Sequence, residues 1–314
     1  MTPRTSPLLS PVFTLDEARS LGLTDYDLYR AGLESPHLGL RMAPGHQPDP
    51  LMVAGKLATR DPSLVLTHQT AAHVWGLWLP SSMREPTIHL ARRRGQGGIP
   101  RIEGTTGHLT AAQDQDIQRI RGVAVTSPVW TWTDLASVQL TLRELVAAGD
   151  SLLQRADGPP RAARHEGINP LATLEAMHEV VNRRPGISGA ALLRRALKLV
   201  RSGVDSSPES WVRTGLVEDG WPEPDVNPLL TFEDGWSVRP DLAYRQWRIA
   251  VQYEGQHHFS QAQQYASDIH RDDRLSQRGW ETIRLSSQVL TPAGWHDFTD
   301  RLRRAVQRQA PQHL

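Results

Sequence analysis

The chain has 314 residues, of which 39% are hydrophobic and 22% are charged, as in folded globular proteins. No run approaches the roughly 18 apolar residues of a membrane-spanning helix, and prolines interrupt the first residues, so we expect a cytoplasmic protein with no membrane contact. The absence of cysteine excludes disulfides, thiolate catalysis and cysteine-ligated zinc, so a bound metal must use oxygen or imidazole ligands.

Charge divides the chain unevenly. From Asp205 onward there are 12 Arg and 16 Asp plus Glu, so this part is acidic, whereas the part before it is basic. Lys56 and Lys198 are the only lysines, and neither lies in the acidic part. The motifs that point to chemistry are concentrated in the acidic part.

Two short helices are predicted near the N-terminus. Thr14 and Glu17 have the spacing of a capping box for a helix through Leu21, and Thr24 begins a second helix that should end near Gly32. A strand over residues 38–42 would then act as a wing. These elements predict a winged-helix-like domain over residues 1–60.

The middle of the chain alternates between helical and extended patterns. We expect helices over 50–59 and 67–75, and strands over 87–91 and 123–126, in a middle α/β region that covers 61–155. Residues 155–170 are rich in proline and glycine, which indicates a linker. Apolar residues at helical spacing over 171–183 and 189–202 predict amphipathic helices, so residues 156–202 form a linker and helical connector.

The last third predicts a mixed sheet flanked by helices, over residues 203–308. Helices are expected over 208–219, 261–278 and 292–306, and strands over 226–232, 236–244, 249–254 and 282–285. Combined with the winged-helix-like region and the connector, this succession places the protein in the α+β or α/β class.

Three polar side chains of this last region are expected to converge. Asp241 ends one predicted strand, and Gln252 and Glu254 point to the same face of the next strand because side chains alternate. Oxygen ligands of this kind suit Mg²⁺ or Mn²⁺, which can activate water for phosphodiester hydrolysis. Glu209, in the first turn of the preceding helix, would add a third acid; a stabilising interaction with the helix dipole would explain it equally well.

Two further groups could assist such a site. His258 lies in a histidine pair just after the strand, where it could transfer a proton or be an ordinary turn residue. Arg271 lies on the next predicted helix at the spacing of Asp268 and Asp272, where it could hold a phosphate or belong to a solvated ladder of ion pairs.

These residues resemble a known family. Ser207-Pro208-Glu209, Arg239-Pro240-Asp241, Tyr253-Glu254-Gly255 and Gly279-Trp280 are similar in order and spacing to the very-short-patch-repair-like endonuclease domains of the PD-(D/E)XK superfamily. The resemblance covers about the last third of the chain. It implies a Mg²⁺-dependent endodeoxyribonuclease with a metal site of Glu209, Asp241 and Glu254. Gln252 departs from the pattern, because these proteins usually carry Glu there, and Glu254 takes the usual lysine position.

The N-terminal part resembles the winged-helix region of AbiEi-type antitoxins, through residues 13–32 and the segment His68-Gln69-Thr70-Ala71-Ala72-His73-Val74-Trp75-Gly76. This resemblance implies a DNA partner. Arg30, on the presumed recognition helix, and Arg93, in the run Arg92–Arg94 beside three glycines, are the predicted phosphate contacts; an ordinary charged loop would explain Arg93 as well. Asp25 and Asp27 make the presumed recognition helix acidic, which favours a protein partner instead. A second hypothesis is therefore a catalytically silent regulator or antitoxin-like protein whose nuclease-like domain serves binding or dimerisation.

Overall fold

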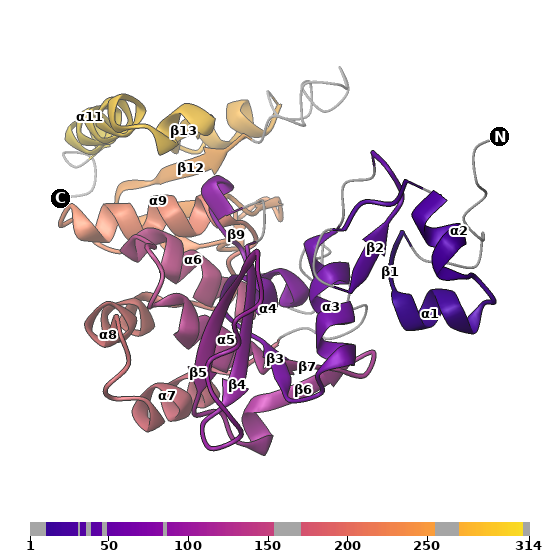
Figure 1. Cartoon of the computed structure of the whole chain (residues 1–314). Coiled ribbons are helices and arrows are strands. Elements are labelled where there is room, and N and C mark those ends of the chain that lie inside the picture. Colours follow the sequence, from indigo (N-terminus) through magenta and orange to yellow (C-terminus); the bar gives the residue numbers. More distant parts are fainter. Residues whose placement is uncertain are drawn as a thin grey trace. The chain divides into compact units, whose positions relative to one another are not determined.

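The computed structural model describes residues 11–30, 32–35, 39–45, 49–83, 87–153, 171–254 and 270–309. Within them the protein is a mixed α+β chain that forms two compact units (Figure 1). Unit 1 contains the described residues through Gln139 together with Ala176–Ala190, and unit 2 contains the described residues from Leu140 to Glu175 and from Ala191 onward. None of the described helices is long and apolar enough to cross a membrane. The four predicted domains stay a prediction.

Unit 1 opens with a small antiparallel pair of strands and two short helices. β1 (Val12–Thr14) pairs with β2 (Leu40–Met42), and α1 (Leu15–Ser20) and α2 (Asp25–Arg30) come between them in the chain. Thr14 accepts a hydrogen bond from the Glu17 amide at 3.1 Å, and the Glu17 carboxylate accepts one from the Thr14 amide at 2.8 Å. The predicted capping box is confirmed; the winged-helix assignment stays a prediction.

The main sheet of unit 1 has five strands in the order β5-β4-β3-β7-β6. β3 pairs antiparallel with β4 and parallel with β7, so the sheet is mixed. The predicted helices over 50–59 and 67–75 and strands over 87–91 and 123–126 are confirmed. The elements are α3 (Pro50–Arg60), β3 (Leu64–Leu66), α4 (His68–Trp75), η1 (Ser81–Met83), β4 (Ile88–Arg93), β5 (Thr105–Thr110), η2 (Asp114–Asp116), β6 (Ile117–Ile120), β7 (Val123–Thr126) and α5 (Pro128–Leu135).

Unit 2 is built on a four-stranded sheet in the order β13-β12-β11-β8. β12 pairs antiparallel with β11 and parallel with β13, as expected for a mixed sheet. A separate two-stranded ribbon joins β9 and β10. The strands are β8 (Asp225–Val226), β9 (Leu230–Thr231), β10 (Ser237–Val238), β11 (Leu242–Tyr244), β12 (Ile249–Tyr253) and β13 (Glu281–Leu285).

The remaining helices follow in the chain after α5, and most of α7 belongs to unit 1. They are α6 (Leu142–Leu152), α7 (Leu174–Arg183), α8 (Ala190–Leu199), α9 (Ser207–Glu218), η3 (Arg245–Trp247), η5 (Ser287–Leu290) and α11 (Pro292–Gln309), and residues 270–276 are also helical. The predicted helices over 171–183, 189–202, 208–219 and 292–306 are confirmed with small shifts of their ends. For the predicted helix over 261–278, the residues before 270 lie outside the described residues.

Two of the predicted strands were wrong in length, because each divides into two shorter strands. The strand predicted over 226–232 is interrupted at Asn227, whose φ of 43° lies in the left-handed region. The strand predicted over 236–244 is interrupted before Asp241, because Pro240 has no amide hydrogen to donate to a neighbouring strand. The break allows the Asn227 amide to bond the Asp241 carbonyl at 2.8 Å.

The two faces of the unit 2 sheet bury different cores. Val251 and Leu242 pack with residues of α9 and α11, such as Leu216 and Leu302, in the larger cluster. Ala250 packs with Leu275 and the aromatic residues near β9 and β10 in the smaller cluster. Since side chains alternate along β12, Gln252 shares the face of Ala250, away from the larger core.

Candidate metal centre

Asp241 lies just before β11, opposite the end of β12. Its Oδ1 accepts a hydrogen bond from Gln252 Nε2 at 2.7 Å, and its Oδ2 accepts one from the Tyr253 amide at 2.6 Å. The antiparallel register pairs Leu242 with Val251, which places Asp241 beside Gln252. The predicted approach of Gln252 to Asp241 is therefore confirmed.

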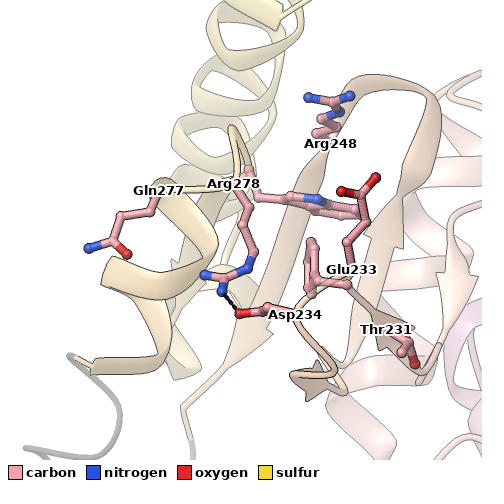
Figure 2. Close-up of a pocket in the computed structure, with 8 residues that line it drawn as sticks. Thr231, Glu233, Asp234, Arg248, Gln277 and Arg278 are labelled. Carbon is pink, nitrogen blue, oxygen red and sulfur yellow. Dashed lines mark hydrogen bonds and ion pairs between the residues drawn. The ribbon is translucent and has the colours of Figure 1, made fainter.

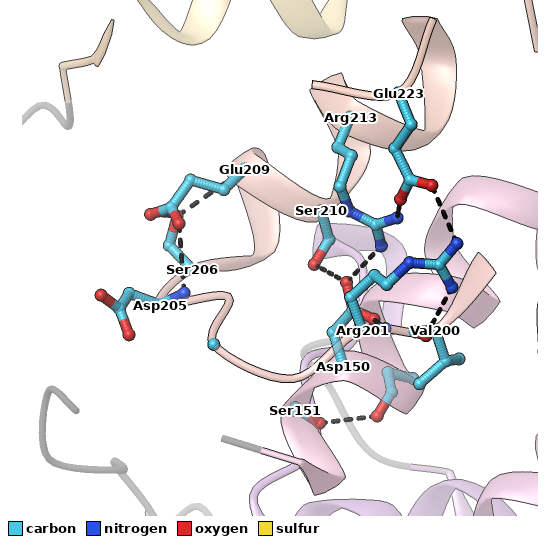
Figure 3. Close-up of polar contacts among 12 residues, drawn as sticks. Asp150, Ser151, Val200, Arg201, Asp205, Ser206, Glu209, Ser210, Arg213 and Glu223 are labelled. Atoms are coloured by element: carbon cyan, nitrogen blue, oxygen red, sulfur yellow. Dashed lines mark hydrogen bonds and ion pairs between the residues drawn. The ribbon is translucent and has the colours of Figure 1, made fainter. Parts of the chain in front are cut away.

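Glu209 lies in the first turn of α9 with only 6% of its surface exposed. Its carboxylate accepts hydrogen bonds from Ser206 Oγ at 2.7 Å, the Asp205 amide at 3.1 Å and Asn227 Nδ2 at 2.9 Å. Figure 3 shows Glu209 over the Asp205–Ser206 turn at the start of the helix. These bonds fix a carboxylate that burial alone would make costly.

Burial and neighbouring charges raise the pKa values of Glu209 and Asp241. Burial, followed by the negative charge of Asp241, raises the pKa of Glu209 to about 7. Burial raises the pKa of Asp241 to about 6, with a further contribution from the charge of Asp205, while the Tyr253 amide and the charge of Arg271 oppose this rise. Both carboxyls thus lie where a negative charge is costly, and a cation bound beside them would offset that cost.

Glu254 follows β12 directly, and the structure gives its carboxylate a different partner. Arg284 on β13 forms an ion pair with Glu254 through Nη1 and with Asp272 through Nε, the latter at 2.6 Å. Arg284 stands opposite Gln252 in the parallel register, so all of these side chains share one face of the sheet. One guanidinium thus compensates two carboxylates, and the described carboxylates of Glu209, Asp241 and Glu254 do not all lie within 4.8 Å of one another.

The other predicted site residues are distributed as follows. Arg271 lies near enough to Asp241 for its charge to lower the pKa of that carboxyl, in the direction opposite to burial. Arg93, at the end of β4 in unit 1, forms an ion pair with Asp114 at 2.7 Å. Arg30 is the last residue of α2, and its side chain is not described. His258 lies outside the described residues.

Asp205 and Asn227 belong to the site but were not predicted from the sequence. Asp205 lies four residues before Glu209, donates its amide to that carboxylate and adds charge next to Asp241. Asn227 carries no motif; its side chain reaches Glu209 because the break between β8 and β9 turns it inward, where it is 7% exposed. An Asn within a predicted strand was the one available signal, because Asn is disfavoured there.

A buried polar cluster anchors the helix that carries Glu209. Arg213 on α9 and Asp150 on α6 form an ion pair at 2.8 Å, and both side chains are 0% exposed. Ser210 donates to Asp150 at 2.6 Å, and Glu223 accepts from Arg213 at 2.7 Å (Figure 3). Since these bonds fix α9 one turn after Glu209, they fix the position of the candidate ligand as well.

An aromatic groove lies on the same side of unit 2 as the smaller core. It is lined by Thr231, Phe232, Glu233, Asp234, Arg248, Gln277, Arg278 and Trp280 (Figure 2). Phe232 stacks on Trp236 with ring centroids 5.3 Å apart, and the Arg278 guanidinium lies 4.9 Å from the Trp236 ring centroid. Arg278 also pairs with Asp234, so its charge is partly satisfied within the protein.

Comparison with known proteins gives relatives without an assigned activity. No family model matches the chain. Two proteins from different strains of Mycobacterium tuberculosis, both named uncharacterized, are 26% identical to this chain over 167 residues, which is 53% of this chain and 56% of each relative. The chain thus spans about half the length of the curated relatives it matches.

Proposed function

We propose that unit 2 is a Mg²⁺- or Mn²⁺-dependent endodeoxyribonuclease, with its metal site at Asp241. The observation that carries the proposal is the approach of Glu209, which is buried, and Asp241, which is partly buried. Asn227 bonds the Glu209 carboxylate through its side chain and the Asp241 carbonyl through its backbone amide, and Gln252 bonds the Asp241 carboxylate. Oxygen ligands of this kind suit a small divalent cation, which keeps several waters. The resemblance to very-short-patch-repair-like domains supports the same assignment.

Each residue has a role in this proposal. Asp241 and Glu254 hold the metal, and Glu209 is a neighbouring acid that faces the metal or positions its ligands. Arg284 compensates the charge of Glu254 and also pairs with Asp272, a bond that it could keep if Glu254 were to hold a metal. Arg271 holds a phosphate oxygen, and His258 transfers a proton. A bound divalent ion would lower the pKa of water and neutralise charge on the scissile phosphate.

Gln252 accounts for the difference from the family pattern. Its amide nitrogen faces Asp241 at 2.7 Å, which presents a donor where a metal would need an acceptor. Rotation of the terminal amide by about half a turn exchanges its nitrogen and oxygen positions, so Gln252 can offer a neutral oxygen ligand. It contributes no charge in that arrangement, and we therefore expect weaker metal binding than with Glu.

A nicking assay on supercoiled plasmid tests the proposal. The wild-type protein with Mg²⁺ or Mn²⁺ should convert supercoiled to relaxed DNA, and EDTA or Asp241→Asn should abolish the conversion. Asp225→Asn is the matched control, because Asp225 is an exposed acid of the same unit that pairs with Arg245. If the wild-type protein binds neither metal nor cuts any DNA form, the catalytic proposal is rejected.

The hydrogen bond between Gln252 and Asp241 also favours a second candidate function, a catalytically silent regulator. With Gln252 and the Tyr253 amide both donating to Asp241, each of its oxygens already has a protein partner. A nuclease fold held together in this way could serve binding alone. In that case Asp241→Asn would leave DNA or partner binding unchanged, and no metal would alter the thermal stability of unit 2.

The N-terminal helices α1 and α2 have two candidate partners, DNA and a protein. The winged-helix resemblance favours DNA. Asp25 forms an ion pair with Arg19 at 3.1 Å, and the Asp27 carboxylate accepts a hydrogen bond from the Thr24 amide, so both acids have partners within the protein. Tyr26 and Tyr29 are 65% and 87% exposed on α2 and could meet DNA or a protein. Binding to DNA by phosphate contacts would weaken steeply with salt, and binding to a protein through tyrosines would not.

A further inference from the structure

Three histidines that are distant in sequence converge in unit 1. His68 begins α4 directly after β3, His89 lies on β4, and His108 lies on β5. One nitrogen from each ring lies within 4.8 Å of the others. His89 Nδ1 and His108 Nε2 form a hydrogen bond at 2.9 Å, which a bound ion would replace. The rings are stacked, with centroids of His68 and His108 3.9 Å apart.

The strand register explains this convergence. β4 and β5 are parallel neighbours, and His108 pairs with Ala91, two residues along the strand from His89. β3 lies on the other side of β4, and its end leads into His68. The Thr67 amide bonds the His89 carbonyl at 3.3 Å, which ties the start of α4 to the middle of β4. The cluster is therefore set by backbone pairing and not by flexible side chains alone.

A hydroxyl and a carboxylate orient one of the rings. Thr67 Oγ1 donates its single hydrogen to Asp134 Oδ2 at 2.6 Å, and it lies 3.1 Å from His68 Nδ1. Because that hydrogen is used, Thr67 accepts from His68, which places the ring proton on Nδ1 and leaves the Nε2 lone pair available. Arg184 holds the other oxygen of Asp134 at 2.7 Å, so the carboxylate is fixed in turn. Metal-binding histidines are characteristically oriented by such outer partners.

The backbone of His68 provides an independent sign of constraint. Its φ of 48° lies in the left-handed region, which is unfavourable for a residue with a side chain. Residues held in such conformations occur preferentially at functional sites. Thr67 also leaves its N-cap role unfilled, because its hydroxyl makes no capping bond. The left-handed backbone of His68 and the missing capping bond of Thr67 both place these side chains toward the cluster.

His89 is buried, and His68 and His108 are half-buried. Burial, with the neighbouring histidine charges adding to it, lowers the pKa of His68 to about 3 and that of His89 to about 4. The rings are therefore neutral at pH 7, the form in which imidazole binds metals. Neutral rings agree with the metal site that the positions of the three histidines indicate.

From this geometry we propose that His68, His89 and His108 form a transition-metal site for an ion of the Zn²⁺ class. Three imidazole nitrogens suit Zn²⁺ and related borderline ions, and they do not suit Mg²⁺, which prefers oxygen. Among the described residues no other histidine or acid joins the three as a ligand. The fourth tetrahedral position would therefore hold water or an exchangeable anion. This site is separate from Asp241 and does not depend on the nuclease proposal.

The test is titration of the full chain, stripped of metal, with Zn²⁺ at pH 7.5 in competition with a chromophoric chelator. We expect one tight equivalent in the wild-type protein. His89→Gln and His108→Gln should each lose it, and Thr67→Val should weaken it by roughly the 10–100-fold typical of outer-shell changes. His73→Gln is the matched control, because His73 lies on the same helix but bonds the Met83 carbonyl, outside the cluster. Asp241→Asn should also keep the tight equivalent.

A measurement on the wild-type protein covers the case in which a histidine variant fails to fold. X-ray absorption of the Zn²⁺-loaded chain should show imidazole scattering from about three rings at roughly 2.0 Å. Oxygen-dominated coordination, or loss of the tight equivalent in Asp241→Asn but not in the cluster variants, would overturn the proposal. Unchanged affinity in correctly folded His89→Gln and His108→Gln would overturn it as well.

Discussion

Gln252 donates its side-chain amide to Asp241 across the β11–β12 pair at 2.7 Å. Replacing this amide with a carboxylate places a third negative charge beside Glu209 and Asp241. In Gln252→Glu we therefore expect tighter Mg²⁺ binding and faster plasmid nicking, both by about 10-fold or more, since 1.4 kcal/mol of added charge interaction suffices. Gln246→Glu adds the same charge on the exposed η3 turn and should change neither quantity. Equal responses of the two variants would contradict the proposed site.

Glu209 gives the metal-free protein a particular pH dependence. Its pKa in the folded state is about 7, above the ordinary 4.5, so folding favours the protonated form. This contribution to stability is complete below pH 4.5 and is lost as the pH rises to about 7. Each pKa unit corresponds to about 1.4 kcal/mol, so the expected loss is a few kcal/mol.

The measurement is the free energy of unfolding in urea at several pH values between 4.5 and 8, with EDTA present. Glu209→Gln should remove the Glu209 contribution above pH 4.5, leaving the parts due to Asp241 and to His68 and His89. Addition of Mg²⁺ to the wild-type protein should restore stability most at the high end of this range. The histidines His68 and His89, whose pKa values are lowered, add stability as the pH rises in both proteins, so the comparison with Glu209→Gln decides. A profile that Glu209→Gln leaves unchanged would show that Glu209 is not held as described.

The buried ion pair of Asp150 and Arg213 predicts a large stability effect. Asp150→Asn leaves the Arg213 charge buried with Glu223 as its remaining acidic partner. Removal of one partner of a buried pair costs about 3–5 kcal/mol, and chemical denaturation should show a loss of that size. Asp225→Asn breaks a pair whose side chains are more than half exposed, and it should cost less than about 1 kcal/mol. Similar losses in both variants would show that the buried pair has no special weight.

Glu254 can be distinguished from a purely structural partner of Arg284. Glu254→Gln and Asp272→Asn each remove one of the two carboxylates that Arg284 contacts. If Glu254 binds metal, only Glu254→Gln should lower the Mg²⁺ affinity, by about 10-fold or more. Titration calorimetry of the two variants measures this directly. An equal effect of both substitutions would mean that Glu254 acts only through Arg284.

Local signals predicted a large part of the fold. The capping box at Thr14 fixed the start of α1, and apolar spacing predicted α3, α4, α8, α9 and α11 to within a few residues. These signals succeed because helix caps and amphipathic faces depend on residues three or four positions apart. The strand breaks near Asn227 and Pro240 were harder to predict, because the apolar pattern continues across both breaks whereas the strand pairing does not.

Of the two candidate sites, part of the Asp241 site was predicted from the sequence and the histidine cluster was not, because only the first depends on residues that are close in the chain. Asp241 and Gln252 were paired correctly, because a short turn connects their strands and alternation decides which side chains face each other. The partner of Glu254 comes from β13, a parallel strand reached by a long crossover, and no local pattern indicates it. His68, His89 and His108 meet only through a sheet of non-consecutive strands, so no characteristic spacing reveals them.

The salt bridge between α6 and α9 has a practical consequence for dissecting the protein. Unit 2 includes α6, which precedes α9 by more than fifty residues in the chain. A fragment that begins at residue 203 would contain α9 without its partner Asp150. It would also expose the surface of α9 that α6 covers. Such a fragment is expected to aggregate or degrade in the cell, whereas one that begins near Leu140 retains the complete unit. Failure of the shorter fragment to cut DNA would therefore be uninformative about catalysis.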